Sequence, residues 1–168
     1  MAVKENDLKN RSIVCTEYQP ELCSCRMADA DYARFKENKR KLAIKIGAIK
    51  LKFEKDNQLS SIKAYEALEE KCQISVSTFK YAIKGDKRYT ANRRFLYKFV
   101  VGLKLSLEEA NELFELENGR LNESCLEDLI CMCALRDNDD IYEFIEEFED
   151  KTGSKISLRE RKTDRINR

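Results

Sequence analysis

A concentration of positive charge in the middle of the chain is the first feature with a chemical meaning. Val76–Lys104 contains eight basic residues and one acidic residue, a net charge of +7. Lysine and arginine side chains donate hydrogen bonds to phosphate and carboxylate oxygens and attract polyanions over several ångströms. The segment therefore predicts a polyanion partner, with solvated helix faces as the alternative explanation.

Negative charge dominates the segment that follows. Leu105–Asp150 contains sixteen acidic and two basic residues, a net charge of −14, and Lys151–Arg168 returns to +5. The net charge of +1 for the whole chain hides this segregation. We expect the apolar faces of the acidic region to pack on the core or on a second subunit. Its acidic side chains could dock a protein partner or screen the basic face.

Several kinds of catalytic and metal-binding site lack the residues that they need. The chain has no histidine, so imidazole bases, imidazole metal ligands and Ser-His or Cys-His pairs are absent, and it has no glycine-rich phosphate loop. Cys15, Cys23 and Cys25 could supply three zinc ligands, but their spacing matches no common zinc motif. We therefore expect a protein that is not an enzyme and that holds no cofactor and no metal.

The cysteines and the N-terminal residues indicate the compartment. Seven cysteines are an odd number, and Met1–Arg11 lacks the apolar segment of an export signal. No run of apolar residues reaches the length of a membrane span. We expect a cytoplasmic protein with reduced thiols and no membrane contact.

Apolar residues at helical spacing predict an all-α protein, in which the charged residues must be positioned by helices. The chain has one proline and five glycines, and it is rich in charged residues. The longest pattern runs from Asp31 to about Lys55. Its apolar face is formed by Leu42, Ile46, Ile49 and Phe53, and its lysines, Lys50 included, occupy the remaining faces.

Six shorter helices follow the long one, and each begins at a residue that can cap a helix N-terminus. The expected caps are Ser60 or Ser61, Ser77, Thr90, Ser106 with Glu109, Ser124 with Glu127, and Asp140 with Glu143. Gly85, Asn118-Gly119 and Gly153 are the expected stops. Inward-facing residues are expected to include Ile62, Tyr65, Leu68, Cys72, Phe79, Ile83, Leu96, Phe99, Leu107, Leu113, Leu126, Leu129, Ile130, Cys133, Phe144 and Phe148.

These patterns divide the chain into four parts. We expect an irregular N-terminal arm at 1–32 and a helical domain at 33–120. A C-terminal helical extension at 121–152 and a basic tail at 153–168 complete the chain.

The segment Ala64–Gly85 reads as a helix-turn-helix, because a helix of about ten residues, a tight break and a short helix follow one another. The run Ile74-Ser75-Val76-Ser77-Thr78-Phe79, with Gly85 six residues on, resembles the family of phage repressor and Cro proteins, the XRE-type family. The later run Leu96–Leu105, followed by Ser106-Leu107-Glu108-Glu109-Ala110, resembles the fourth and fifth helices of that family. The similarity covers about residues 42–116.

The resemblance implies a five-helix repressor-like domain extended by two acidic helices. It also implies a sequence-specific regulator of transcription that reads the major groove of double-stranded DNA with helix 77–84, and it suggests a homodimer. The implied contacts to base edges are Val76, Ser77, Lys80 and Tyr81. The implied contacts to phosphates are Thr78, Lys84, Lys87, Arg88, Arg93 and Arg94. The alternative is an adaptor or antitoxin-like module whose acidic helices at 105–150 bind a protein partner.

Overall fold

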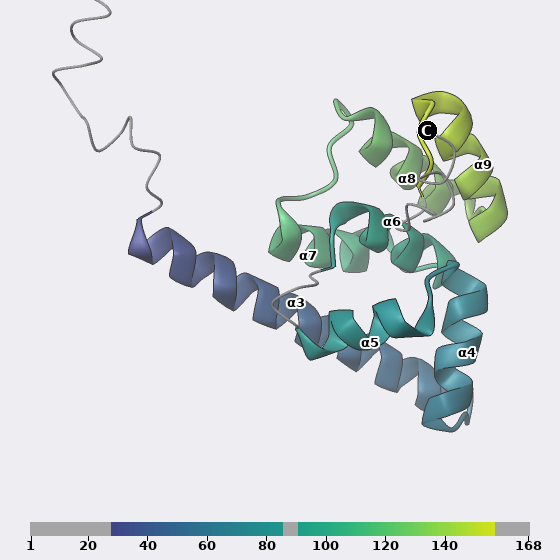
Figure 1. The fold of residues 1–168 in the computed structure, drawn as a ribbon. Coiled ribbons are helices and arrows are strands. Elements are labelled where there is room, and N and C mark those ends of the chain that lie inside the picture. The colour runs from purple at the N-terminus through teal and green to yellow at the C-terminus, as the bar shows by residue number, and fades with distance from the viewer. Residues whose placement is uncertain (1–27, 86–90, 157–168) are drawn as a thin grey trace, which may run out of the picture. The chain divides into compact units, whose positions relative to one another are not determined.

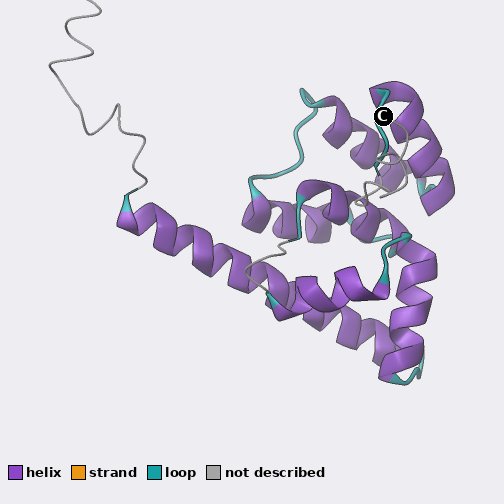
Figure 2. Ribbon diagram, viewed as in Figure 1, coloured by secondary structure: helices purple, strands orange, loops and turns teal. Residues whose placement is uncertain are grey.

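The computed structural model describes residues 28–85 and 91–156, and within these residues all regular structure is helical (Figure 2). Figure 1 labels the helices as α3 (Asp29–Asp56), α4 (Ser61–Cys72), α5 (Val76–Lys84), α6 (Arg93–Gly102), α7 (Leu107–Glu117), α8 (Leu126–Asp137) and α9 (Ile141–Thr152). The all-α prediction is confirmed. The predicted arm at 1–32, with Cys15, Cys23 and Cys25, lies almost wholly outside the described residues, as does most of the tail at 153–168.

The chain divides into two compact units, of which the second begins at Glu37 within α3. In the described part of the first unit, Arg34 pairs with Asp31 at 3.0 Å, and the Lys36 ammonium lies 4.4 Å from the centre of the Tyr32 ring. All the features analysed below belong to the second unit. None of the helices in the described ranges combines the length and the apolar character that crossing a bilayer requires.

Helix α6 is the centre of the second unit. It packs against α4, α7, α8 and α9, and its residues from Phe95 to Val101 are all buried. A segment that is buried on every side is expected to be apolar on every side, and the run from Phe95 to Val101 follows this rule except at Lys98. Because α8 and α9 also contact α6, the residues after position 120 share one hydrophobic core with those before it.

The expected helix ends are confirmed at several positions. Ser60 caps α4, and capping boxes join Ser106 to Glu109 and Asp140 to Glu143. Gly85 and Gly153 adopt the left-handed conformation that ends α5 and α9, with φ of 63° and 68°.

Other expected ends are wrong. Helix α6 is capped by Asn92 rather than Thr90, which lies outside the described residues. Helix α8 begins after Cys125 without a side-chain cap, because Ser124 lies one residue too early to serve. Asn92 is itself a preferred capping residue, and its side-chain oxygen accepts a 2.8 Å hydrogen bond from the Phe95 amide.

The expected inward faces also need correction at several positions. Ile62, Leu107, Leu126 and Leu129 are exposed, with 73%, 41%, 50% and 38% of their surfaces accessible. Three of these residues lie in the first turn of a helix, which projects beyond the core. Cys131 takes the buried position on α8, whereas Cys133 is only half-buried.

Lys50 was expected on an exposed face and is buried instead, where it pairs with Glu54 and donates a 2.8 Å hydrogen bond to Ser61 Oγ.

Candidate nucleic-acid interface

Helix α5 begins at Val76, and Ser75 rather than Ser77 is its cap. The Ser75 hydroxyl accepts a hydrogen bond from the Thr78 amide at 3.3 Å and lies 2.8 Å from the Thr78 hydroxyl. Ile74 before the cap and Phe79 four residues into the helix are both buried, which is the arrangement of a hydrophobic staple. The expected cap, Ser77, is therefore wrong, and this apolar pair is the sequence signal that identifies Ser75 as the cap.

Buried side chains hold α5 firmly against the rest of the unit. The Phe79 ring lies 5.6 Å from the Phe95 ring and 5.9 Å from the Phe99 ring, both of α6, measured between centroids. At its C-terminal end, α5 approaches α3 closely. A Cβ atom at Gly47 of α3 would lie 3.4 Å from the Ile83 side chain, and one at Gly85 would lie 3.5 Å from Ala43 Cβ. Such packing makes α5 a rigid support for the side chains on its opposite face.

The opposite face of α5 is a single exposed stripe. Ser77, Lys80, Tyr81 and Lys84 are spaced at i, i+3, i+4 and i+7, and all four side chains are exposed. We call these four residues the α5 stripe. Val76 and Thr78 are only half-buried and flank its beginning. The structure thus brings together all six residues expected on this helix as contacts to bases or phosphates.

The electrostatic setting of the stripe is positive. Helix α5 has two lysines and no acidic residue, and its amide end adds the positive pole of the helix dipole. Tyr65 of α4 lies beside the stripe, with the Lys80 ammonium 5.4 Å and the Lys50 ammonium 4.7 Å from its ring centre. An aromatic face between two ammonium groups stabilises their charge and limits the motion of Lys80.

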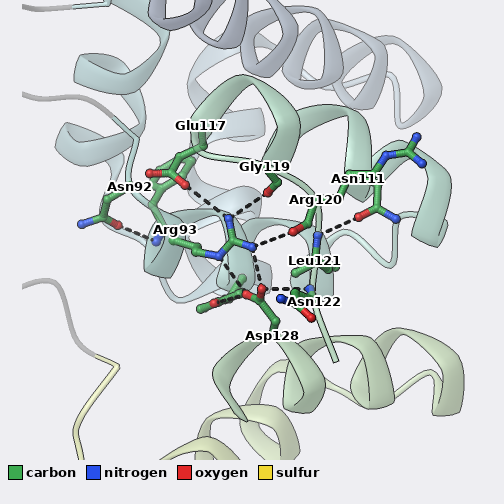
Figure 3. Close-up of polar contacts among 11 residues, drawn as sticks. Asn92, Arg93, Asn111, Glu117, Gly119, Arg120, Leu121, Asn122 and Asp128 are labelled. Atoms are coloured by element: carbon green, nitrogen blue, oxygen red, sulfur yellow. Dashed lines mark hydrogen bonds and ion pairs between the residues drawn. The ribbon is translucent and has the colours of Figure 1, made fainter. Parts of the chain in front are cut away.

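Arg93 lies elsewhere and is held inside the protein (Figure 3). Its guanidinium donates hydrogen bonds to both carboxylate oxygens of Asp128 in α8, at 2.8 and 2.6 Å, and to the carbonyl oxygens of Gly119 and Arg120, at 3.0 and 3.1 Å. It also pairs with Glu117 at 3.4 Å. These acceptors use the donors that a phosphate would need, so we leave Arg93 out of the interface.

The other described basic residues of Val76–Lys104 that lie outside α5 are also buried or bonded to other parts of the protein. Arg94 pairs with Glu127 at 2.9 Å and donates a 3.1 Å hydrogen bond to the Lys155 carbonyl. Lys98 is buried, and Lys104 donates a 3.2 Å hydrogen bond to the Asn138 carbonyl. Lys87 and Arg88 lie outside the described residues. The charge that the sequence concentrates in one segment is therefore divided between the α5 stripe and contacts with the acidic helices.

One contact near α5 was not anticipated from the sequence. Gln73, which ends α4 in the left-handed conformation, donates hydrogen bonds from Nε2 to the Glu70 carbonyl at 2.9 Å and to the Tyr142 hydroxyl at 3.0 Å. Tyr142 belongs to the first turn of α9, which places the acidic helices beside the turn that precedes α5. The two residues are separated by 69 positions, and no local pattern relates them.

Carboxylates accumulate at the junction of α8 and α9. Burial raises the pKa of Asp139, and the charges of Glu143, Asp137, Glu147 and Asp140 raise it further. Asp139 therefore lies within range of the charges of four other carboxylates, of which Asp137 is paired with Arg136 at 2.7 Å. The junction lies within 105–150, the region at which a protein partner was expected.

The described cysteines fall into two groups. Cys72 and Cys131 are buried, and burial raises the pKa of the Cys72 thiol to about 12, so both behave as small apolar residues. Cys125 is exposed and Cys133 is half-buried.

Searches of family models, curated proteins and solved structures return no match for this chain. The function of the chain is therefore inferred from its own geometry.

Proposed function

We propose that this protein is a sequence-specific regulator of transcription that binds double-stranded DNA by placing α5 in the major groove. The observation that carries the proposal is the α5 stripe, a row of polar and basic side chains on a short helix that aromatic packing holds in place. The major groove admits one α-helix, and base edges are read there by hydrogen bonds from such side chains.

The connection between α4 and α5 supports the proposal. Three residues, 73–75, separate the helices, and the left-handed conformation of Gln73 turns the chain sharply. A supporting helix, a tight turn and a short exposed helix form the helix-turn-helix motif. The resemblance to the phage repressor family implies five helices, and we propose that α3 to α7 are these five.

Each stripe residue has a definite chemical role in this proposal. Ser77 and Tyr81 carry hydroxyl groups that donate to or accept from base edges, and Lys80 donates to the acceptors O6 and N7 of guanine. Val76 contacts a thymine methyl group, and Thr78 and Lys84 bind phosphates on either side. Lys87 and Arg88 follow Lys84 in the sequence and are proposed as further phosphate contacts.

A selection from a random pool of DNA duplexes tests the proposal. The protein is incubated with the pool at two salt concentrations, and the retained duplexes are sequenced. We expect an enriched motif and binding that weakens steeply with salt, because each phosphate contact releases a counterion. The variant Lys80→Ala should change the enriched motif, whereas Lys151→Ala, which removes an equal charge from α9, should leave it unchanged.

Two results would contradict the proposal. Retention without any enriched motif would mean a nonspecific electrostatic contact, and no retention at low salt would mean that DNA is not the ligand. A circular dichroism spectrum equal to that of the wild type must accompany each variant, so that a loss of binding is not a loss of folding.

The carboxylates at the junction of α8 and α9 favour a second candidate function, that of a protein-interaction module. A basic partner is complementary to the negative charge gathered around Asp139, and binding of that kind does not involve α5. The charge reversals Lys84→Glu and Glu147→Lys distinguish the two functions. Association with a protein partner should survive Lys84→Glu and be lost in Glu147→Lys, and DNA binding should show the opposite response.

A further inference from the structure

An open groove separates α3 from α7 on a part of the surface that the proposed DNA interface does not use. Ile44 of α3 and Leu116 of α7 give it apolar side chains. Lys41 and Lys45 lie on the α3 side, and Glu112 and Glu115 lie on the α7 side. One ion pair, from Lys45 to Glu112, crosses the groove. The groove therefore has an apolar interior between one basic wall and one acidic wall.

The apolar side chains of the groove continue along α3. Ile44, Ala48 and Leu51 are spaced at i, i+4 and i+7 and are all exposed, Ile44 to 59% and Leu51 to 53%. Ile44 lies two positions from both Leu42 and Ile46, which is about 200° around a helix, so its stripe faces away from the core. An exposed apolar stripe of this kind beside an apolar groove marks an interaction surface.

We propose that this surface binds a second copy of the same chain. A two-fold axis places the same patch of both copies face to face, so that α3 of each copy meets α7 of the other. The basic wall of one groove then faces the acidic wall of the other, and the apolar stripes are buried between them. The opposite charges of the two walls make the surface complementary to itself, which a patch of one charge cannot be. This inference does not depend on the proposed binding of DNA.

Sedimentation velocity over a range of protein concentrations, in the absence of DNA, provides the first test. We expect a dimer that dissociates on dilution, and we expect Ile44→Glu to raise its dissociation constant about tenfold or more, because a carboxylate is placed in an apolar contact. Ile62→Glu is the matched control. Ile62 is another exposed isoleucine, on α4, and its replacement should leave the dimer unchanged.

Complementary charge reversals provide a second test that no loss of folding can imitate. Lys41→Glu and Glu115→Lys each place like charges opposite one another in a dimer of identical copies, so each variant alone should be mainly monomeric. An equal mixture of the two variants should dimerise, because the mixed dimer restores an opposite pair on both sides of the axis. Both side chains are largely exposed, so the loss of their partners Glu37 and Arg120 costs little stability.

The proposal is overturned by any of three results. The chain could remain monomeric at every concentration, its dimer could be insensitive to Ile44→Glu or equally sensitive to Ile62→Glu, or the mixture of Lys41→Glu and Glu115→Lys could fail to associate. Because none of these measurements contains DNA, their failure leaves the proposed regulator function standing, and failure of the DNA selection leaves the dimer standing.

Discussion

Arg93 in α6 donates two hydrogen bonds to Asp128 in α8, from Nε to Oδ1 at 2.8 Å and from Nη2 to Oδ2 at 2.6 Å. The Asp128 carboxylate also accepts from the Tyr97 hydroxyl and, at 3.0 Å, from the Asn122 amide. With an exposed fraction of 2%, Asp128 is a buried charge whose acceptors are saturated by its neighbours. The pair therefore joins the basic and acidic halves of the sequence inside one core.

Removing the Asp128 charge should destabilise the protein strongly. Asp128→Asn leaves the Arg93 guanidinium without its main partner, and breaking a buried ion pair in this way costs about 3 kcal/mol or more. Urea denaturation followed by circular dichroism measures the change in free energy of unfolding. Asp137→Asn removes an exposed partner of Arg136 and should remain close to the wild type, so an equal loss in both variants would refute the buried-pair explanation.

The same residue should contribute to acid sensitivity. Burial by itself raises the pKa of Asp128, but the hydrogen bonds from Arg93, Tyr97 and the Asn122 amide outweigh burial and hold the pKa below its usual value. A depressed pKa in the folded state means that Asp128 stabilises the fold above the unfolded-state pKa, and that this stabilisation is lost as the pH falls from about 5. The free energy of unfolding should therefore decline less steeply below about pH 5 in Asp128→Asn. An unchanged decline would show that other carboxylates control it.

Gly102→Ala should destabilise the contact between α4 and α6. A Cβ atom at this position would lie 2.5 Å from the Lys71 carbonyl oxygen and 2.7 Å from Cys72 Cα, which are backbone atoms that cannot move aside. Forcing extra atoms into a packed core costs about 1–3 kcal/mol. Gly47→Ala is the matched control within a helix, because its Cβ meets only the Ile83 side chain at 3.4 Å and gains helix propensity. Thermal unfolding should separate the two variants in opposite directions.

Lys98→Met should make the protein more stable. The Lys98 side chain is 6% exposed, and within the described residues its ammonium has neither a hydrogen bond nor an ion pair. Burial lowers the pKa of Lys98, although the nearby Cys72 acts in the opposite direction. Because the pKa of Lys98 is lower in the folded chain than in the unfolded chain, the folded chain loses this proton at a lower pH, and the wild type gains stability as the pH rises. The difference in free energy of unfolding between Lys98→Met and the wild type should therefore shrink at alkaline pH. Lys71→Met, at an exposed position on α4, should show neither the gain nor its pH dependence.

Two residues of the α5 stripe should respond differently in DNA binding, if the proposed function holds. Lys84→Ala should weaken binding to all duplexes alike and lower the slope of log affinity against log salt by about 1, because one phosphate contact is lost. Tyr81→Ala should leave that slope unchanged and relax the preference for one base pair. Fluorescence anisotropy with the selected duplex and with single-base variants measures both effects. The assigned roles would be contradicted if Tyr81→Ala lowered the salt slope and Lys84→Ala relaxed the preference for one base pair.

The sequence was most informative where a short pattern determines structure locally. Glycines located the C-terminal ends of α5 and α9, and capping boxes located the starts of α7 and α9, since these signals act within four residues. Ser77, Lys80, Tyr81 and Lys84 were expected as DNA contacts from the resemblance to the phage repressor family, and all four are exposed on α5. The composition of the α5 stripe was therefore available before the structure.

Contacts between distant segments could not be obtained from the sequence in this way. Arg93 and Lys80 look alike as members of one basic segment, yet Arg93 faces Asp128 while Lys80 remains on the surface. What separates them is the position of α8, which is fixed by the core and not by local spacing. Lys50 is a similar case, because its burial depends on Ser61 and Tyr65 of the following helix.

The packing of α5 separates two tasks within nine residues. Phe79 and Ala82 are buried and fix the helix to the core, and the four stripe side chains are exposed. The stripe positions can therefore be randomised together while the helix keeps its place. A library of variants made in this way would alter the chemistry of the exposed face on an unchanged framework, and new binding preferences would be selected without re-engineering the fold.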